Sequence, residues 1–201
     1  MKSIDIKGTA RTEFGKKGAK QLRKSNLIPC ILYGVNKDEK GLPVATPFSI
    51  QPEEVRNLVY SPDIHTVNLT IDGKTVLAIM KDIQFHAVND SILHMDFYQI
   101  TENKPIVMNV PIKLTGLAAG VKAGGKLEQF IRRVKCKALY NIIPEKVEID
   151  VTKLTIGKVI KVGDISLEGI ELVNQKNTVI CCVTSTRASS DAAASEEAGK
   201  E

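Results

Sequence analysis

The sequence contains no tryptophan, and only 4% of its 201 residues are aromatic. Proteins that bind single-stranded nucleic acid stack bases on aromatic side chains, so this scarcity argues against stacking as a main mode of recognition. No apolar run approaches the ~18–20 residues that a transmembrane helix requires. The N-terminus also lacks the apolar stretch of a secretory signal. We therefore expect a cytoplasmic protein with no membrane partner.

Sequence motifs for catalysis, metal binding and nucleotide binding are equally scarce. The four cysteines, at positions 30, 136, 181 and 182, form no C-x-x-C pair. Cys181 and Cys182 are adjacent on a predicted strand, so their side chains point to opposite faces and do not converge on a zinc ion. We interpret the thiols as reduced and structural. The histidines form no H-E-x-x-H, and neither a nucleotide-binding glycine loop nor a serine elbow is present. We expect no catalytic residue, no metal and no cofactor.

The composition is that of a globular protein with an uneven charge. Hydrophobic residues make up 43% and charged residues 25% of the chain, the mean hydropathy is −0.06 and the net charge is +5. Residues 1–24 carry eight Lys and Arg against two acids, and residues 101–188 carry fourteen against eight. Residues 25–100 and 189–201 are net acidic. Basic clusters of this kind are typical of proteins that bind a polyanion, and are equally compatible with a well-solvated surface.

Residues 1–100 combine strand patterns with two short helical patterns. Apolar alternation or short apolar runs predict strands over 3–9, 30–33, 45–50 and 92–98, and helix-forming residues predict helices over 19–25 and 52–60. Asp72-Gly73 predicts a tight hairpin between strands 65–71 and 74–80. Five or six strands with two helices in this span indicate a small β-barrel.

The strand pattern of residues 101–188, which has almost no helical periodicity, predicts a second, all-β domain. Strands are expected over 106–114, 130–139, 146–151 and 178–184, and Gly120 and Gly124-Gly125 are interpreted as turns. The tail 189–201, rich in Ala, Ser, Glu and Gly, is predicted to be disordered. The chain is therefore predicted to be mainly β, with domains at 1–100 and 101–188 and a disordered acidic tail.

Two groups of polar side chains in the first domain could bind a polyanion. A helix beginning near Gly18 would direct free N–H groups toward an entry loop that holds Lys16 and Lys17, and helix N-termini attract phosphate. Lys20 and Arg23 are three residues apart and can share one face of that helix. An ordinary solvated basic helix is the alternative.

The second group is His94 and Asp96, which leave one face of a predicted strand while Met95 and Phe97 leave the other. In the wide, shallow minor groove of an RNA helix a carboxylate can accept from the guanine amino group, and an imidazole can donate to a phosphate or hydroxyl. A surface pair that makes only a local hydrogen bond is the plainer alternative. An acid–base pair of an enzyme would need a nucleophile or metal that the sequence does not offer.

Three segments together carry a family resemblance. They are Arg11-Thr-Glu-Phe-Gly-Lys-Lys-Gly-Ala-Lys-Gln-Leu-Arg23 with Ile28-Pro-Cys-Ile-Leu-Tyr-Gly34; Met80-Lys-Asp-Ile-Gln-Phe-His86 with His94-Met-Asp-Phe97; and residues 116–125 with Ile143-Pro144 and residues 150–154. In this order they resemble the bacterial family of large-subunit ribosomal proteins that bind 5S rRNA. More narrowly, they resemble its two-domain form, general stress protein CTC.

The resemblance implies an N-terminal barrel, similar to the anticodon-binding barrel of glutaminyl-tRNA synthetase, that binds the loop E region of 5S rRNA. It also implies a C-terminal β-domain at the central protuberance of the large subunit, beside neighbouring ribosomal proteins; we expect no DNA partner. With Lys17 added from the same basic segment, the predicted RNA-binding residues are Arg11, Lys16, Lys17, Lys20, Arg23, Tyr33, Gln84, His94 and Asp96. The alternative function is a stress-linked module that binds a protein partner through the C-terminal domain.

The front segment departs from the family pattern at three positions. Lys17 stands where glycine is usual, and Lys20 and Gln21 replace arginines. A lysine acts as a point charge and lacks the planar fork with which arginine grips a phosphate. Bidentate phosphate contacts are therefore not expected at these positions.

Overall fold

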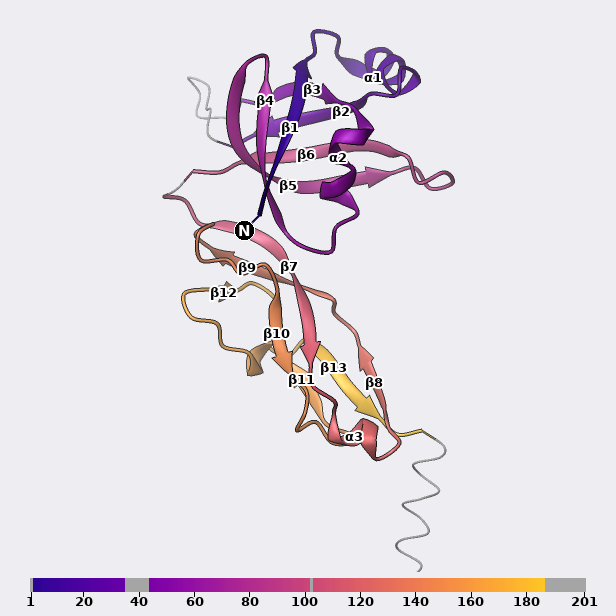
Figure 1. Ribbon diagram of the computed structural model, residues 1–201, viewed down its shortest axis with the longest axis vertical. Coiled ribbons are helices and arrows are strands. Elements are labelled where there is room, and N and C mark those ends of the chain that lie inside the picture. Colours follow the sequence, from indigo (N-terminus) through magenta and orange to yellow (C-terminus); the bar gives the residue numbers. More distant parts are fainter. Residues whose placement is uncertain (1, 35–43, 102, 187–201) are drawn as a thin grey trace, which may run out of the picture. The chain divides into compact units, whose positions relative to one another are not determined.

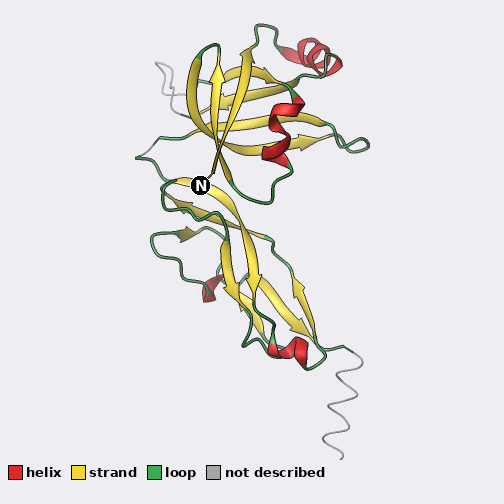
Figure 2. Cartoon of the chain, viewed as in Figure 1, coloured by secondary structure: helices red, strands yellow, loops and turns green. Residues whose placement is uncertain are grey.

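The structure, a computed structural model, describes residues 2–34, 44–101 and 103–186. It divides into two compact units, residues 1–106 with 139–141 and residues 107–138 with 142–201. Strands predominate in both, which confirms the prediction of a mainly β protein (Figures 1 and 2). The predicted charged loop at 36–41 and the acidic tail at 189–201 lie outside the described residues.

The first unit is a closed six-stranded barrel, as predicted (Figure 1). Its strands are β1 (Lys2–Ala10), β2 (Ile28–Tyr33), β3 (Thr46–Ile50), β4 (His65–Ile71), β5 (Lys74–Phe85) and β6 (Ile92–Gln99). They follow the order β1-β3-β2-β6-β5-β4, and β4 closes the barrel by pairing in parallel with β1. β2 and β6 are also parallel, whereas the remaining neighbours are antiparallel.

Inward-pointing side chains at alternate positions form the core of the barrel. Phe48 and Phe97 are fully buried, and their ring centroids are 5.7 Å apart. Met95 lies on β6 two residues before Phe97 and is fully buried as well. Burial of each such side chain contributes ~1.5–3 kcal/mol, and a slip of one residue would exchange the two faces of the strand. The core therefore fixes which side chains of β6 face outward.

The predicted hairpin between β4 and β5 is present. Asp72 and Gly73 connect the strands with φ angles of +47° and +84°. Positive φ at both central residues is the requirement of a type I′ turn, whose twist matches that of the strands. The Asp-Gly pair thus sets the register of this hairpin.

β5 is longer than predicted. It continues beyond Met80 to Phe85, with a shift in its pairing with β6 between Met80 and Asp82. An extra residue, Lys81, is inserted there, and such a bulge interrupts the alternation of inward and outward side chains. The prediction ended the strand at the point where its pattern broke.

Two helices accompany the barrel: α1 (Gly15–Lys24) and α2 (Pro52–Val59). α2 begins with proline and has Glu53 and Glu54 in its first turn, as the helix dipole favours. α1 begins at Gly15, earlier than the predicted start near Gly18. Lys16 and Lys17 therefore lie in the first helical turn and not in an entry loop.

The second unit contains two sheets, with strand orders β10-β7-β9-β12 and β11-β13-β8. Its elements are β7 (Ile106–Thr115), α3 (Ala119–Lys122), β8 (Lys126–Gln129), β9 (Arg133–Ala138), β10 (Val147–Asp150), β11 (Val159–Lys161), η1 (Val162–Asp164), β12 (Glu171–Leu172) and β13 (Val179–Thr184). The predicted strands correspond to β7, β9, β10 and β13. The sequence prediction missed β8, β11 and β12, because runs of two to four residues show little alternation.

One turn assignment in this unit was wrong. Gly120 is buried inside the four-residue helix α3. A Cβ atom at Gly120 would lie 2.7 Å from the backbone nitrogen of Ile156, so the close packing of α3 requires glycine there. A helix of one turn is too short to display helical periodicity in the sequence.

Candidate nucleic-acid interface

Three adjacent strands of the barrel carry four of the predicted RNA-binding residues. Gln84 on β5 is directly opposite His94 on β6. Asp96 follows two residues later on the same outward side, and Tyr33 on β2 is aligned with Tyr98 on β6. We call these five side chains the β6 face. Directly opposed residues have Cβ atoms ~4.5–5.5 Å apart, so the register brings these groups together.

His94 and Asp96 form a hydrogen-bonded pair. Nδ1 of His94 lies 2.8 Å from Oδ1 of Asp96, and the two side chains are 28% and 32% exposed. The contact fixes the orientation of the imidazole ring, so that Nε2 serves as its outer polar atom. Asp96 retains its second oxygen as an acceptor. The pair thus offers a ring nitrogen and a carboxylate oxygen side by side.

Tyr33 and Tyr98 extend the β6 face across the β2–β6 pairing. Their rings meet edge to face, with centroids 5.8 Å apart and planes inclined at 72°, a favourable aromatic geometry. Partial burial raises the pKa of Tyr33, and the neighbouring carboxylates of Asp96 and Asp82 raise it further. The phenol therefore remains a hydrogen-bond donor at neutral pH.

Helix α1 supplies a basic surface from Lys16, Lys17 and Lys20, which we call the α1 lysines. All three are exposed, and the first turn of the helix contains no acidic residue. The N-cap residue, Phe14, provides no side-chain acceptor for the terminal N–H groups. Free N–H groups, the helix dipole and two lysines in the first turn all favour a negatively charged ligand here.

Arg23 has a structural role that the sequence did not indicate. Its Nε and Nη2 atoms both donate to the carbonyl oxygen of Leu93, each at 3.1 Å. Leu93 immediately precedes His94 on β6, so this contact attaches the end of α1 to the strand that carries the β6 face. Two of the five guanidinium donors are used in this way, and the others are available to a ligand.

Arg11 lies just beyond β1 and is held by a neighbouring ring. Its Cζ atom is 5.8 Å from the centroid of the Phe14 ring. The Nε atom is buried without an acceptor, although part of the side chain is exposed. The predicted residues thus fall into two groups on one barrel, the β6 face and the segment from Arg11 through α1, and Arg23 connects them.

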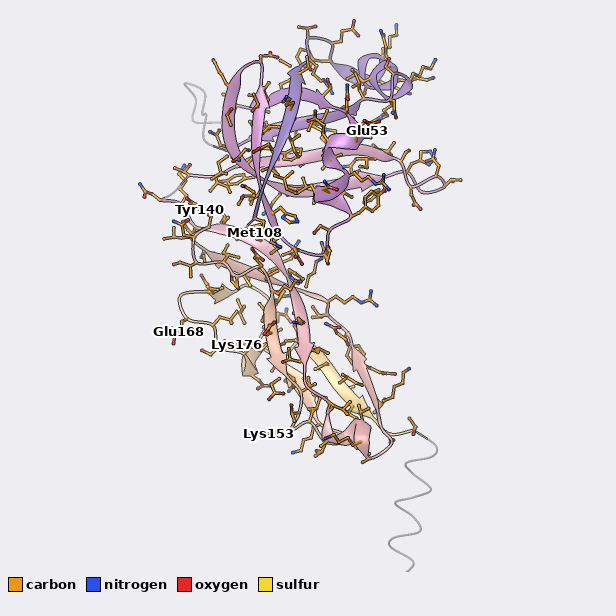
Figure 3. The ribbon with its side chains drawn as sticks, viewed as in Figure 1. Glu53, Met108, Tyr140, Lys153, Glu168 and Lys176 are labelled. Atoms are coloured by element: carbon orange, nitrogen blue, oxygen red, sulfur yellow. The ribbon has the colours of Figure 1, made fainter. Side chains whose placement is uncertain are left out.

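A groove of about 840 Å³ lies beside Arg23, between the end of α1, α2 and the β5–β6 loop. Its lining includes the apolar Leu27 and Ile92 and side chains of both signs of charge, Arg56 and Glu53, the second of which is labelled in Figure 3. Within residues 2–34, 44–101 and 103–186, no three His, Cys, Asp or Glu side chains gather closely enough to hold a metal ion. Over the same residues, no helix is both long and apolar enough to cross a membrane.

In the second unit, several basic side chains are already paired. Lys126 contacts Glu128 at 3.1 Å, Lys137 contacts Glu171 at 2.9 Å, and Lys113 contacts Glu148 at 3.2 Å. Exposed pairs of this kind contribute little to stability, but each places a carboxylate beside the ammonium group and weakens the local positive potential that a polyanion would meet. These three lysines are therefore weaker candidates for phosphate contacts than the unpaired basic residues among those described in this unit.

Comparison with known proteins identifies the class to which the chain belongs. The model of the ribosomal L25p family matches residues 6–97, and that of the ribosomal protein TL5 C-terminal domain matches residues 105–187. A large ribosomal subunit protein bL25 from Phocaeicola vulgatus is 62% identical over 200 residues, covering 100% of both chains. Proteins of the same name from Bacteroides thetaiotaomicron and Porphyromonas gingivalis are 53% and 50% identical, covering 100% and 98% of this chain and 100% of their own lengths.

The chain belongs to the ribosomal L25p family, in its form with a TL5-type C-terminal domain. It is a structural, non-enzymatic ribosomal protein of the large subunit, so its place is the cytoplasmic ribosome. The predictions of a ribosomal protein without enzyme activity are confirmed.

Proposed function

We propose that the protein binds 5S rRNA, at its loop E region, through the barrel. In this proposal the β6 face enters the minor groove of an irregular RNA helix, and Arg11 and the α1 lysines neutralise phosphates beside it. The observation that carries the proposal is the alignment of Gln84, His94 and Asp96 in one outward row by the register of β5 and β6. The row presents an amide, an imidazole and a carboxylate, which together can donate and accept along a line of base edges and 2′-hydroxyls.

The two groups of residues have different tasks. Lysine ammonium groups act on phosphates at long range and provide affinity without reading sequence. Asp96 has an unfavourable charge for a polyanion, so its contribution must come from accepting hydrogen bonds from base amino groups. Selectivity for one RNA over another is therefore expected from the β6 face, and most of the salt dependence from Arg11 and α1.

The test is a titration of the purified protein with 5S rRNA at several salt concentrations, beside an unrelated RNA hairpin of equal length. We expect tighter binding to 5S rRNA, with affinity that falls as salt rises because counterions are released. Equal affinity for the two RNAs would refute the proposal.

Two variants examine the site itself. Arg11→Ala and Asp96→Ala should each weaken binding to 5S rRNA by ~1–3 kcal/mol, and Asp96→Ala should also reduce selectivity over the hairpin. Lys74→Ala, an exposed position at the far end of β5 beside the hairpin turn, is the control for loss of one positive charge. Unchanged affinity in both site variants would refute the site and leave the function open.

For the C-terminal unit we propose contacts with neighbouring ribosomal proteins or RNA at the central protuberance. The alternative function, a stress-linked module that captures a protein partner through this unit, makes a different prediction. Sedimentation of a cell lysate discriminates between the two: a protein that acts on the ribosome co-sediments with large subunits, whereas a module bound to a separate protein partner remains outside that fraction.

A further inference from the structure

An exposed phenylalanine at the start of α1 requires an explanation. Phe14 is 65% exposed and occupies the N-cap position. Ser, Thr, Asp and Asn are preferred at N-caps because their side chains accept from the free N–H groups, which a phenyl ring cannot do. Phe14 therefore contributes neither a cap nor substantial core burial, and its one specific contact in the described structure is with Arg11.

The guanidinium of Arg11 is held in place without being neutralised. Its Cζ atom is 5.8 Å from the Phe14 ring centroid, within the ~6 Å range of a cation–π contact. Within the described part of the chain the arginine makes no ion pair, either with its neighbour Glu13 or with another acid. A ring face attracts the cation but accepts no conventional hydrogen bond from the edge of the guanidinium, so the terminal N–H groups stay available.

The backbone at Arg11 is also fixed. Its N–H donates to the carbonyl oxygen of Pro47 at 3.3 Å, which attaches this residue to the start of β3. A fixed backbone and a ring on one side leave the long side chain few orientations. An arginine that is already ordered loses less conformational entropy when it binds.

We propose that Phe14 is a positioning residue for RNA binding, whose ring holds the Arg11 guanidinium ready for bidentate contact with an RNA phosphate. This inference rests on the proposed function. The α1 lysines lie immediately beyond Phe14, so the ordered arginine would provide the planar fork that lysines at positions 17 and 20 do not.

The experiment is a double-mutant cycle on the full-length protein, with 5S rRNA as the probe. We expect Phe14→Ala to weaken binding by three- to tenfold and Arg11→Ala by a larger factor. In the Arg11→Ala background, Phe14→Ala should have no further effect, because the ring acts only through the arginine. Phe14→Trp should keep the affinity of the parent protein, because the indole also presents an aromatic face. Phe14→Leu should lower the affinity as Phe14→Ala does.

Two further readouts separate positioning from folding. Thermal unfolding of Phe14→Ala should match that of the parent protein, because an exposed ring contributes little to stability. In NMR spectra, the Arg11 side-chain signals should lose their ring-current shift in Phe14→Leu and keep one in Phe14→Trp. A merely structural role would move the unfolding midpoint and would not distinguish the two substitutions in this way.

The contrary outcomes are distinct. If Phe14→Ala weakens binding equally with and without Arg11, the ring contacts the RNA itself and the positioning role is wrong. If Phe14→Ala leaves affinity unchanged while Arg11→Ala lowers it, the ring is dispensable and the role is again wrong. If the parent protein fails to prefer 5S rRNA over the control hairpin, the proposed function fails, and the inference falls with it.

Discussion

At the scale of single residues, the cysteines show how burial alone determines the state of a side chain. All four thiols are free and buried. Burial raises the pKa of Cys30 to about 12 and that of Cys136 to about 11, because a thiolate loses its hydration in the interior. Cys30 and Cys136 are therefore protonated packing groups and weak nucleophiles in the folded protein.

This burial predicts a loss of stability at alkaline pH. In the unfolded chain both thiols have their ordinary pKa of 9.0. Above that pH the unfolded state releases protons that the folded state keeps, so the free energy of unfolding falls. The contribution is complete below about pH 9 and is lost progressively up to about pH 11–12, with a slope of up to ~1.4 kcal/mol per pH unit for each thiol. Denaturant unfolding of the reduced protein from pH 7 to 11 measures it.

The control is Cys30→Ala. Its free energy of unfolding should be lower than that of the parent protein at pH 7, but should fall less steeply as the pH rises above 9. A thiol reagent should modify Cys30 and Cys136 only at the rate of unfolding. Rapid modification at pH 8 in the folded state would contradict the burial of these groups.

At the scale of elements, the attachment of α1 to the barrel depends on Arg23. Arg23→Ala removes both hydrogen bonds to Leu93, and we expect a loss of ~0.5–1.5 kcal/mol in stability. Amide hydrogen exchange in α1 should become faster, since the end of the helix opens more easily. Lys24→Ala is the matched control: it removes the same charge from an exposed neighbour in the same helix. Equal effects of the two variants would show that charge, and not the contact with Leu93, is what matters.

The sequence could predict those elements that are defined by interactions between residues close together in the chain. The hairpin depends on two adjacent residues, Asp72 and Gly73, and the outward side of β6 on strict alternation, so both are visible in the sequence. The inserted Lys81 breaks the alternation of β5, and α3 fits its glycine against Ile156, which is distant in the sequence. The continuation of β5 past the bulge and the formation of α3 therefore leave no periodic pattern in the sequence by which they could be predicted.

The candidate site shows the same division. The pairing of His94 with Asp96 follows from their spacing on one strand. The position of Gln84 opposite His94 depends on the register beyond the bulge, and the bonds from Arg23 to Leu93 join residues 70 apart in the sequence. Composition suggested only that the front segment was basic. The contact that joins this segment to the β6 face became visible only in three dimensions.

At the scale of the whole molecule, each unit contains a hydrophobic cluster of its own. The barrel cluster is built entirely from residues between Ile6 and Phe97. A cluster of the second unit is built from residues between Ala118 and Val183, with Leu114 packed against it. These two clusters have no buried residue in common, so removal of the second unit takes no side chain from the barrel cluster.

This separation predicts that the barrel folds and binds alone. A chain shortened to residues 1–104 keeps every residue of the barrel cluster, the β6 face, Arg11 and the α1 lysines. We expect it to unfold in one cooperative transition and to bind 5S rRNA with the affinity and salt dependence of the full chain, to within about threefold. Circular dichroism first establishes that it is folded, and titration at several salt concentrations then measures binding. A folded barrel whose affinity is tenfold lower and whose salt dependence is shallower would mean that the second unit also contacts phosphates. Arg132 and Arg133, which have no ion-pair partner within the described residues, would then be the side chains to replace.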